Sequence, residues 1–174
     1  MNRIAIEACA NVILWTIRLA TLCYAAALAQ LIYRRDARPL WTLGCLLYLA
    51  HVLAAFHFAY HWSHAFAVTE TARQTQALFG LNWGGGVWFN YVFTALWTAD
   101  TLWWWRSPQT RASRPLWLSR SIHFYLAWMF INGAIVFPQG LTRWVSLALA
   151  AALVLAAKHA KLNSNASREH RQPH

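Results

Sequence analysis

Four histidines are clustered in one short stretch of the chain, at His51, His57, His61 and His64. A helix turns about 100° per residue, so the last three share one helical face and His51 points about 120° away. Imidazoles at i, i+3 and i+4 can chelate one ion, and imidazole suits Zn, Cu and Fe. We therefore predict a transition-metal site at His57, His61 and His64, with Glu70 as an outside ligand. The alternative is that these histidines are boundary residues that bond to water and backbone.

Haem is the second cofactor that the histidines suggest. A haem with two axial ligands needs two histidines from facing helices at one depth. His51 and His123 are the candidates, and their depths along the predicted helices differ by about 6 Å, which helix tilt could absorb. The 13-residue separation of His51 and His64 resembles that of stacked haems, but no second matching pair accompanies it. At most one haem is expected.

Arg18 and Asp100 are charged residues inside otherwise apolar segments. A charge near the centre of a bilayer costs about 2.5–3.5 kcal/mol on insertion scales, so such residues usually pair or line a cavity. The predicted depths of the two differ by about 6 Å, within reach of a long arginine side chain. We predict an Arg18–Asp100 ion pair that fixes helix register. The functional alternative is a proton or ion path through Asp100 and His123.

Composition places these residues in a membrane protein. Hydrophobic residues make up 59% of the 174 residues and charged residues only 11%. Soluble domains have about a quarter charged residues, so this chain could not cover a soluble surface with polar groups. The net charge of +10 does not indicate nucleic acid, because the basic residues occupy short segments between apolar runs. The lipid bilayer is the expected partner.

Five segments are long and apolar enough to be predicted as transmembrane helices, because a bilayer core needs about 20 mostly apolar residues in a helix. They are residues 8–33, 40–62, 86–105, 116–137 and 141–157. The fold class is therefore all-α, a polytopic bundle within residues 1–162 followed by a disordered tail, 163–174. The Pro-Gln-Gly stretch at 138–140 predicts a tight turn. Residues 69–79 are predicted to form a short outer interfacial helix with Thr69 as N-cap and Gly80 as stop.

Basic residues fix the predicted orientation. Arginine and lysine are frequent at 34–38, at 106–114 and in the tail, and rare at 65–85. The positive-inside rule then places the amino terminus outside and the tail in the cytoplasm, for example of a bacterial inner membrane. Nine tryptophans fall at predicted span ends, where indole rings prefer to lie; Trp41 is one of them.

Three functions follow as hypotheses. The first is a small membrane metal or redox protein with a histidine site near the outer face. The second is a non-catalytic subunit or scaffold that assembles with other membrane proteins or with itself. The third is an ion or proton transporter, which the lack of internal repeats disfavours. No Walker, GxSxG, CxxCH or HExxH motif is present, so the sequence does not assign an enzyme activity.

Overall fold

A computed structural model describes residues 3–136 and 141–169, and every regular element in these ranges is helical. The prediction of an all-α fold is confirmed. The elements are α1 (Arg3–Ile32), α2 (Arg38–Ala54), the π-helical η1 (Ala55–Ala59), α3 (His64–Phe79), α4 (Gly86–Arg106), α5 (Pro108–Ala112), α6 (Leu116–Ile131), the π-helical η2 (Asn132–Val136) and α7 (Leu141–Glu169).

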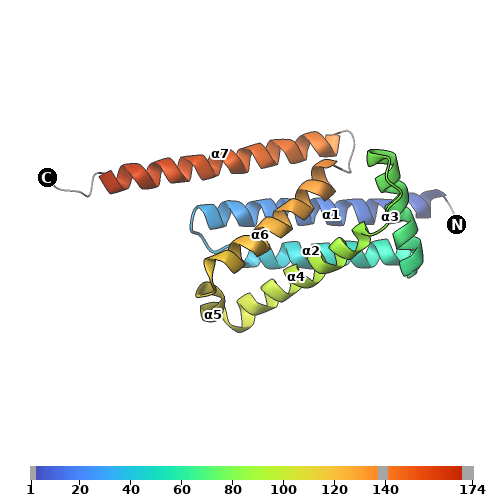
Figure 1. Ribbon diagram of the computed structural model, residues 1–174, viewed down its shortest axis with the longest axis horizontal. Coiled ribbons are helices and arrows are strands. Elements are labelled where there is room, and N and C mark those ends of the chain that lie inside the picture. The colour runs from blue at the N-terminus through green and yellow to red at the C-terminus, as the bar shows by residue number, and fades with distance from the viewer. Residues whose placement is uncertain (1–2, 137–140, 170–174) are drawn as a thin grey trace.

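The long helices form a bundle with a short helix at each end (Figure 1). Helices α1 and α2 form an antiparallel hairpin, α7 lies along α1, and α4 and α6 cross the hairpin at a tilt. Helix α3 crosses the end of the bundle where α1 begins, and α5 lies at the opposite end (Figure 1). This arrangement separates the segment predicted to face out from the segment predicted to face in.

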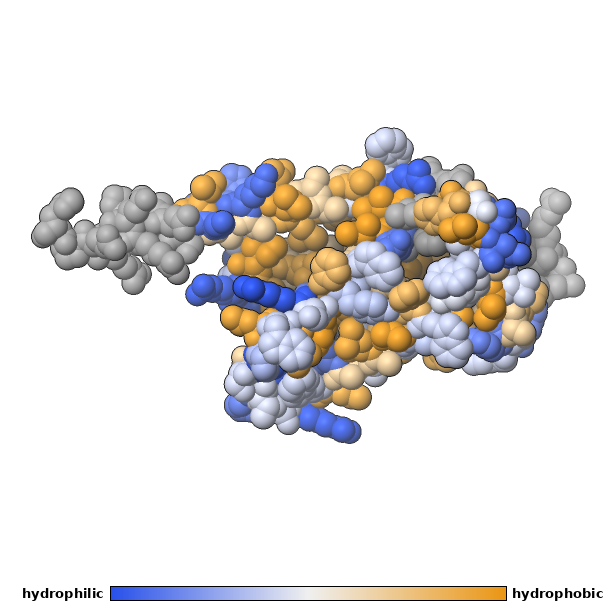
Figure 2. Space-filling model, viewed as in Figure 1, coloured by the Kyte–Doolittle hydropathy of each residue, from blue (hydrophilic) through white to orange (hydrophobic). Residues whose placement is uncertain are grey.

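Within the described part of the chain, three helical segments are long and apolar enough to cross a membrane: Glu7–Ile32, Arg38–Ala59 and Arg143–Asn163. They correspond to the first, second and fifth predicted spans. Large apolar side chains lie on the outside of the bundle, and Figure 2 shows hydrophobic residues over much of the visible face. Phe124, for example, is 75% exposed, an arrangement that lipid favours and water opposes.

Aromatic side chains fill the centre of the bundle and hold α1, α2, α4 and α6 together. Tyr24 stacks on Phe130 with ring centroids 4.0 Å apart, and Trp41 lies edge-on to Trp97 at 5.9 Å. Trp41 and Trp97 are fully buried. Trp41 lies in the first turn of α2, at a helix end as predicted, but its ring packs inside the bundle against Trp97 of α4 and His123 of α6.

Several predicted helix boundaries change. The second span was predicted to run to residue 62, but α2 ends at Ala54 and continues only as a π-helical turn to Ala59. The outer helix begins earlier than predicted, at a Ser63 N-cap rather than Thr69, and ends as predicted at Gly80, which has a φ of 71°. Helix α7 runs on to Glu169, so residues 163–169 are helical rather than disordered. The predicted turn at 138–140 lies outside the described residues.

Candidate functional site

The predicted three-histidine face is not formed. The prediction required one uninterrupted helix from His57 to His64. In the structure the helix is interrupted between these two residues. His61 and Trp62 take left-handed backbone conformations, with φ of 49° and 58°, and α3 starts in a new direction at His64. The rotation of 100° per residue applies only within a regular helix. This break carries the three imidazoles onto separate segments.

The histidines and Glu70 each have other neighbours. His57 Nδ1 accepts a hydrogen bond from Trp62 Nε1 at 3.4 Å, and His64 Nδ1 is 2.8 Å from the Tyr91 hydroxyl. The His61 ring lies beside Phe66. Among the described residues, no three His, Cys, Asp or Glu side chains are grouped so that they could hold a metal ion.

Glu70 belongs to the surface of α3. Both of its carboxylate oxygens accept hydrogen bonds from the Arg73 guanidinium, at 2.8 and 2.6 Å, and one also accepts from the Gln74 amide. Arg73 lowers the pKa of Glu70 from its ordinary value, and Gln74 acts in the same direction. Within α3 this carboxylate is thus committed to its own helix and is not directed at the histidines.

His51 and His123 lie at different levels of the bundle. The His123 ring packs edge-on against Trp41, with centroids 5.3 Å apart, whereas His51 lies beside Tyr48. Trp41 and His51 are ten residues apart on α2, which is about 15 Å along the axis. A single haem between His51 and His123 is therefore excluded by this geometry, because the aromatic core lies between them.

Asp100 has two arginine partners that the depth argument did not identify. Arg111 donates to it through Nη2 at 2.8 Å, and Arg114 also bonds to it. The carboxylate is 1% exposed and the two arginine side chains are 10% and 4% exposed. The Arg18 guanidinium lies over the Trp15 ring, 5.2 Å from its centroid. The predicted pairing of Arg18 with Asp100 is corrected: matching depth does not specify which helix faces meet.

The path of the chain after α4 explains this pairing. Pro108 starts α5, which turns the chain back over the end of α4, so that Arg111 and Arg114 approach Asp100 from beyond the helix end. Arg111 also lies 3.6 Å above the Trp104 ring. Sequence analysis used these arginines only as part of a basic segment that indicates the cytoplasmic side. The Ser-Pro pair that reverses the chain was the available signal for a fold-back.

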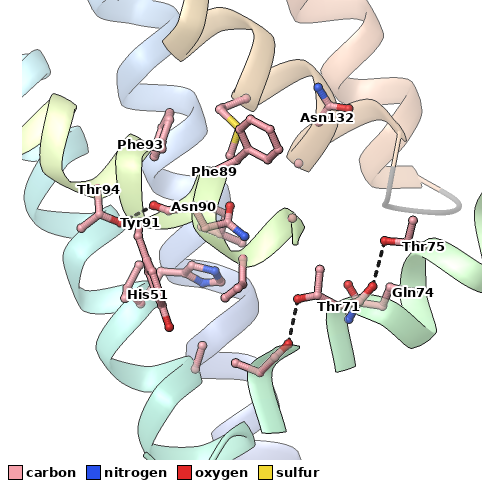
Figure 3. Close-up of a pocket in the computed structure, with 18 of the residues that line it drawn as sticks. His51, Thr71, Gln74, Thr75, Phe89, Asn90, Tyr91, Phe93, Thr94 and Asn132 are labelled. Atoms are coloured by element: carbon pink, nitrogen blue, oxygen red, sulfur yellow. Dashed lines mark hydrogen bonds between the residues drawn. The ribbon is translucent and has the colours of Figure 1, made fainter. Parts of the chain in front are cut away.

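A cavity of about 630 Å³ lies at the α3 end of the bundle. Residues from α1, α2, η1, α3, α4, α6 and η2 line it, so elements from most of the chain contribute to this partly open pocket (Figure 3). Ligand sites in proteins typically measure 300–1,000 Å³ and are mostly apolar with a few placed polar groups. The volume and position of this cavity match such a site.

His51 is the titratable imidazole of this cavity. Its ring extends from α2 into the group of lining residues in Figure 3, and its Nδ1 is 2.9 Å from the carbonyl oxygen of Ile13 on α1. Asn90 on α4, Gln74 on α3 and Asn132 on η2 add amide groups. Among the described residues that line it, none is Asp, Glu, Lys or Arg. Sequence analysis selected His51 as a cofactor ligand, but it did not predict the cavity.

Helix α3 forms one wall of the cavity because glycines allow it to approach the start of α4. A Cβ at Gly84 would overlap the Val68 carbonyl oxygen and lie 2.6 Å from its side chain. A Cβ at Gly86 would lie 3.0 Å from Thr71. A glycine at each of these positions permits the close approach of another group, because it has no Cβ. In the structure the group that approaches them is α3 itself.

The site therefore combines a partly open pocket, an imidazole held by a neighbouring helix and amide groups on the other walls. No protein-family model matches this chain, and comparisons with curated proteins and with solved structures return no match either.

Proposed function

We propose that this protein is a small membrane protein that binds an organic molecule or cofactor in the cavity beneath α3. The observation that carries the proposal is the 630 Å³ cavity with His51 in its wall. The pocket is partly open at the surface of the bundle, and residues of seven helical elements line it. It is large enough to bury a drug-sized ligand.

The proposal includes the membrane topology expected from the sequence. Helix α4 has 21 residues, and α6 with η2 covers residues 116–136, each about 31 Å long and equal to a bilayer core. With the three apolar helices they would give five spans. The distribution of basic residues would place α3 and the cavity at the outer face of a bacterial inner membrane and α5 at the cytoplasmic face.

The cavity has more support than the other sites considered. A metal site at His57, His61, His64 and Glu70 would require the Glu70–Arg73 pair and the His64–Tyr91 hydrogen bond to break. A proton path through Asp100 would require a carboxylate held by Arg111 and Arg114 to release them. The scaffold hypothesis stands as the outcome if the cavity binds nothing.

The test is to identify what copurifies with the protein. Protein purified in mild detergent should carry a stoichiometric organic molecule, detected by solvent extraction and mass spectrometry, with an absorption spectrum to reveal haem or another chromophore. Thr75→Trp places a large ring in the cavity from α3, where Thr75 is buried, and should abolish the copurified molecule.

Gln76→Trp is the matched control, because Gln76 is the next residue of α3 and is exposed. It should retain the bound molecule. Protein that carries no stoichiometric molecule, or a Thr75→Trp variant that retains one as well as Gln76→Trp does, would refute the proposal.

A further inference from the structure

We infer that the ligand of this cavity is an uncharged aromatic alcohol, of the phenol or hydroquinone class, whose hydroxyl donates a hydrogen bond to Nε2 of His51. The inference rests on the proposed function and specifies its substrate class. Three features carry it: the hydrogen bond of His51 to α1, the aromatic cavity wall and the absence of charged residues from that wall.

The hydrogen bond to α1 fixes the tautomer of His51. The Ile13 carbonyl oxygen can only accept, so Nδ1, at 2.9 Å, must carry the proton. In a neutral imidazole the other nitrogen is then an acceptor. Among the described residues Nε2 has no hydrogen-bond partner, and the ring lines the cavity. His51 therefore offers the cavity a lone pair, which selects a ligand with an O–H or N–H group.

The walls select a flat ring. Aromatic side chains from α2, α3, α4 and α6 line the cavity, including Tyr48, Phe79, Phe93 and Trp128. Rings contact other rings through offset or edge-on arrangements, which are worth about 0.5–1.5 kcal/mol beyond the area they bury. Tyr48 also lies beside the His51 ring, with ring centroids 6.2 Å apart. A ligand ring that reaches Nε2 of His51 would therefore lie close to the Tyr48 ring.

The lack of charged side chains in the cavity wall disfavours ionised ligands. None of the described lining residues is Asp, Glu, Lys or Arg, so a carboxylate or ammonium group that loses water on entering the pocket would meet no partner ion among them. Asn90 supplies a neutral amide donor that suits a hydroxyl or carbonyl oxygen, whereas the Gln74 amide already donates to Glu70. A neutral ring with one hydroxyl donor matches His51, and a second oxygen on the ring would match the Asn90 amide.

The test compares three naphthalenes of similar size. 1-Naphthol carries the hydroxyl, 1-methoxynaphthalene lacks the donor, and 1-naphthoate is an anion. Binding to the protein in lipid nanodiscs is measured by titration calorimetry after subtraction of partitioning into empty nanodiscs. One neutral hydrogen bond contributes about 0.5–1.5 kcal/mol, so 1-naphthol should bind up to about tenfold more tightly than the ether. 1-Naphthoate should bind at least tenfold more weakly than 1-naphthol.

Variants assign the preference to His51. His51→Phe retains a ring but has no acceptor, so it should bind the alcohol and the ether equally. His51→Gln retains both a donor for Ile13 and an acceptor, and should keep part of the preference. His159→Phe changes the exposed histidine of α7 and should behave like the parent protein.

Equal binding of alcohol and ether by the parent protein, or an unchanged preference in His51→Phe, would overturn the assignment of a hydroxyl donor. Neither result affects the binding of a molecule in the cavity. Absence of binding by all three naphthalenes would overturn the aromatic class, and the copurification experiment would then decide the proposed function alone. If His51→Phe fails to fold, the comparison of probes on the parent protein and on His51→Gln decides the inference.

Discussion

Asp100 shows how a single buried residue depends on its partners. Its carboxylate is almost completely buried and bonds to Arg111 and Arg114, while Arg114 also donates to the Ser119 hydroxyl. Removal of one member of a buried ion pair leaves the other charge uncompensated, which typically costs 3–5 kcal/mol. The arginines are thus structural partners of Asp100, and their burial depends on the presence of its charge.

We expect Asp100→Asn to lower the free energy of unfolding by about 3 kcal/mol, measured by denaturant titration in detergent. Arg114→Gln combined with Asp100→Asn should show a coupling of about 0.5–3 kcal/mol, because contacting residues are not additive. Arg18→Gln combined with Asp100→Asn should be additive within about 0.5 kcal/mol. Strong coupling to Arg18 and none to Arg114 would contradict the observed pairing.

His51 illustrates a different effect at the residue scale. Its Nδ1 connects α2 to the Ile13 carbonyl oxygen on α1, and the same oxygen accepts a hydrogen bond from the Thr16 hydroxyl. The bond thus both links two helices and determines which ring nitrogen faces the ligand. A histidine without this bond could present either nitrogen, and its preference for a donor ligand would be weaker.

At the scale of elements, α3 forms one wall of the cavity. Ser63 caps its first turn by accepting a hydrogen bond from the Phe66 amide, and Gly80 ends it in a left-handed conformation. The His64–Tyr91 hydrogen bond ties its start to α4. Because the segment before α3 is irregular and the segment after it is glycine-rich, its position depends largely on these few contacts and on the close approach at Gly84.

Gly84→Ala should displace α3 from α4, because the added Cβ has no room beside the Val68 backbone. We expect faster amide hydrogen exchange across α3 and faster proteolysis at Arg73, with slower exchange retained in α1 and α2. Gly133→Ala is the control, since a Cβ there meets nothing within 4 Å. Equal exchange of α3 in the parent protein and in Gly84→Ala would show that the close approach does not hold this helix.

At the scale of the whole molecule, the two ends of the bundle differ. One end carries α3 and the cavity, and the other carries α5 with the arginines that bind Asp100 (Figure 1). The apolar outer surface between the ends favours a membrane position in which the ends lie on opposite sides. This arrangement makes the proposed orientation testable at exposed positions of α3, α5 and α7.

Single cysteines at Gln76, Gln109 and Lys158, introduced after replacement of Cys9, Cys23 and Cys45, should test the orientation. All three new positions are exposed. A membrane-impermeant maleimide applied to intact spheroplasts should label Gln76→Cys, and it should label the other two only after permeabilisation. Labelling of Gln76→Cys and Gln109→Cys from the same side would disprove the five-span topology.

The sequence alone determined the features that depend on local composition. Apolar runs of about 20 residues predicted the long helices, since helix formation in lipid requires only that each segment satisfy its own backbone and present an apolar surface. The end of α3 at Gly80 was also predictable, because glycine readily adopts the left-handed conformation found there.

Only the tertiary structure decided the sites. At the helix interruption before α3, His61 and Trp62 adopt left-handed conformations that non-glycine residues rarely adopt. The residue types at these positions therefore did not predict the interruption. Because the helix is interrupted there, the predicted metal-binding face does not form. The partners of Asp100 depended on how α5 folds back. The cavity is a space between side chains from distant segments, and its existence depends on how the helices pack together, which no single segment of sequence encodes.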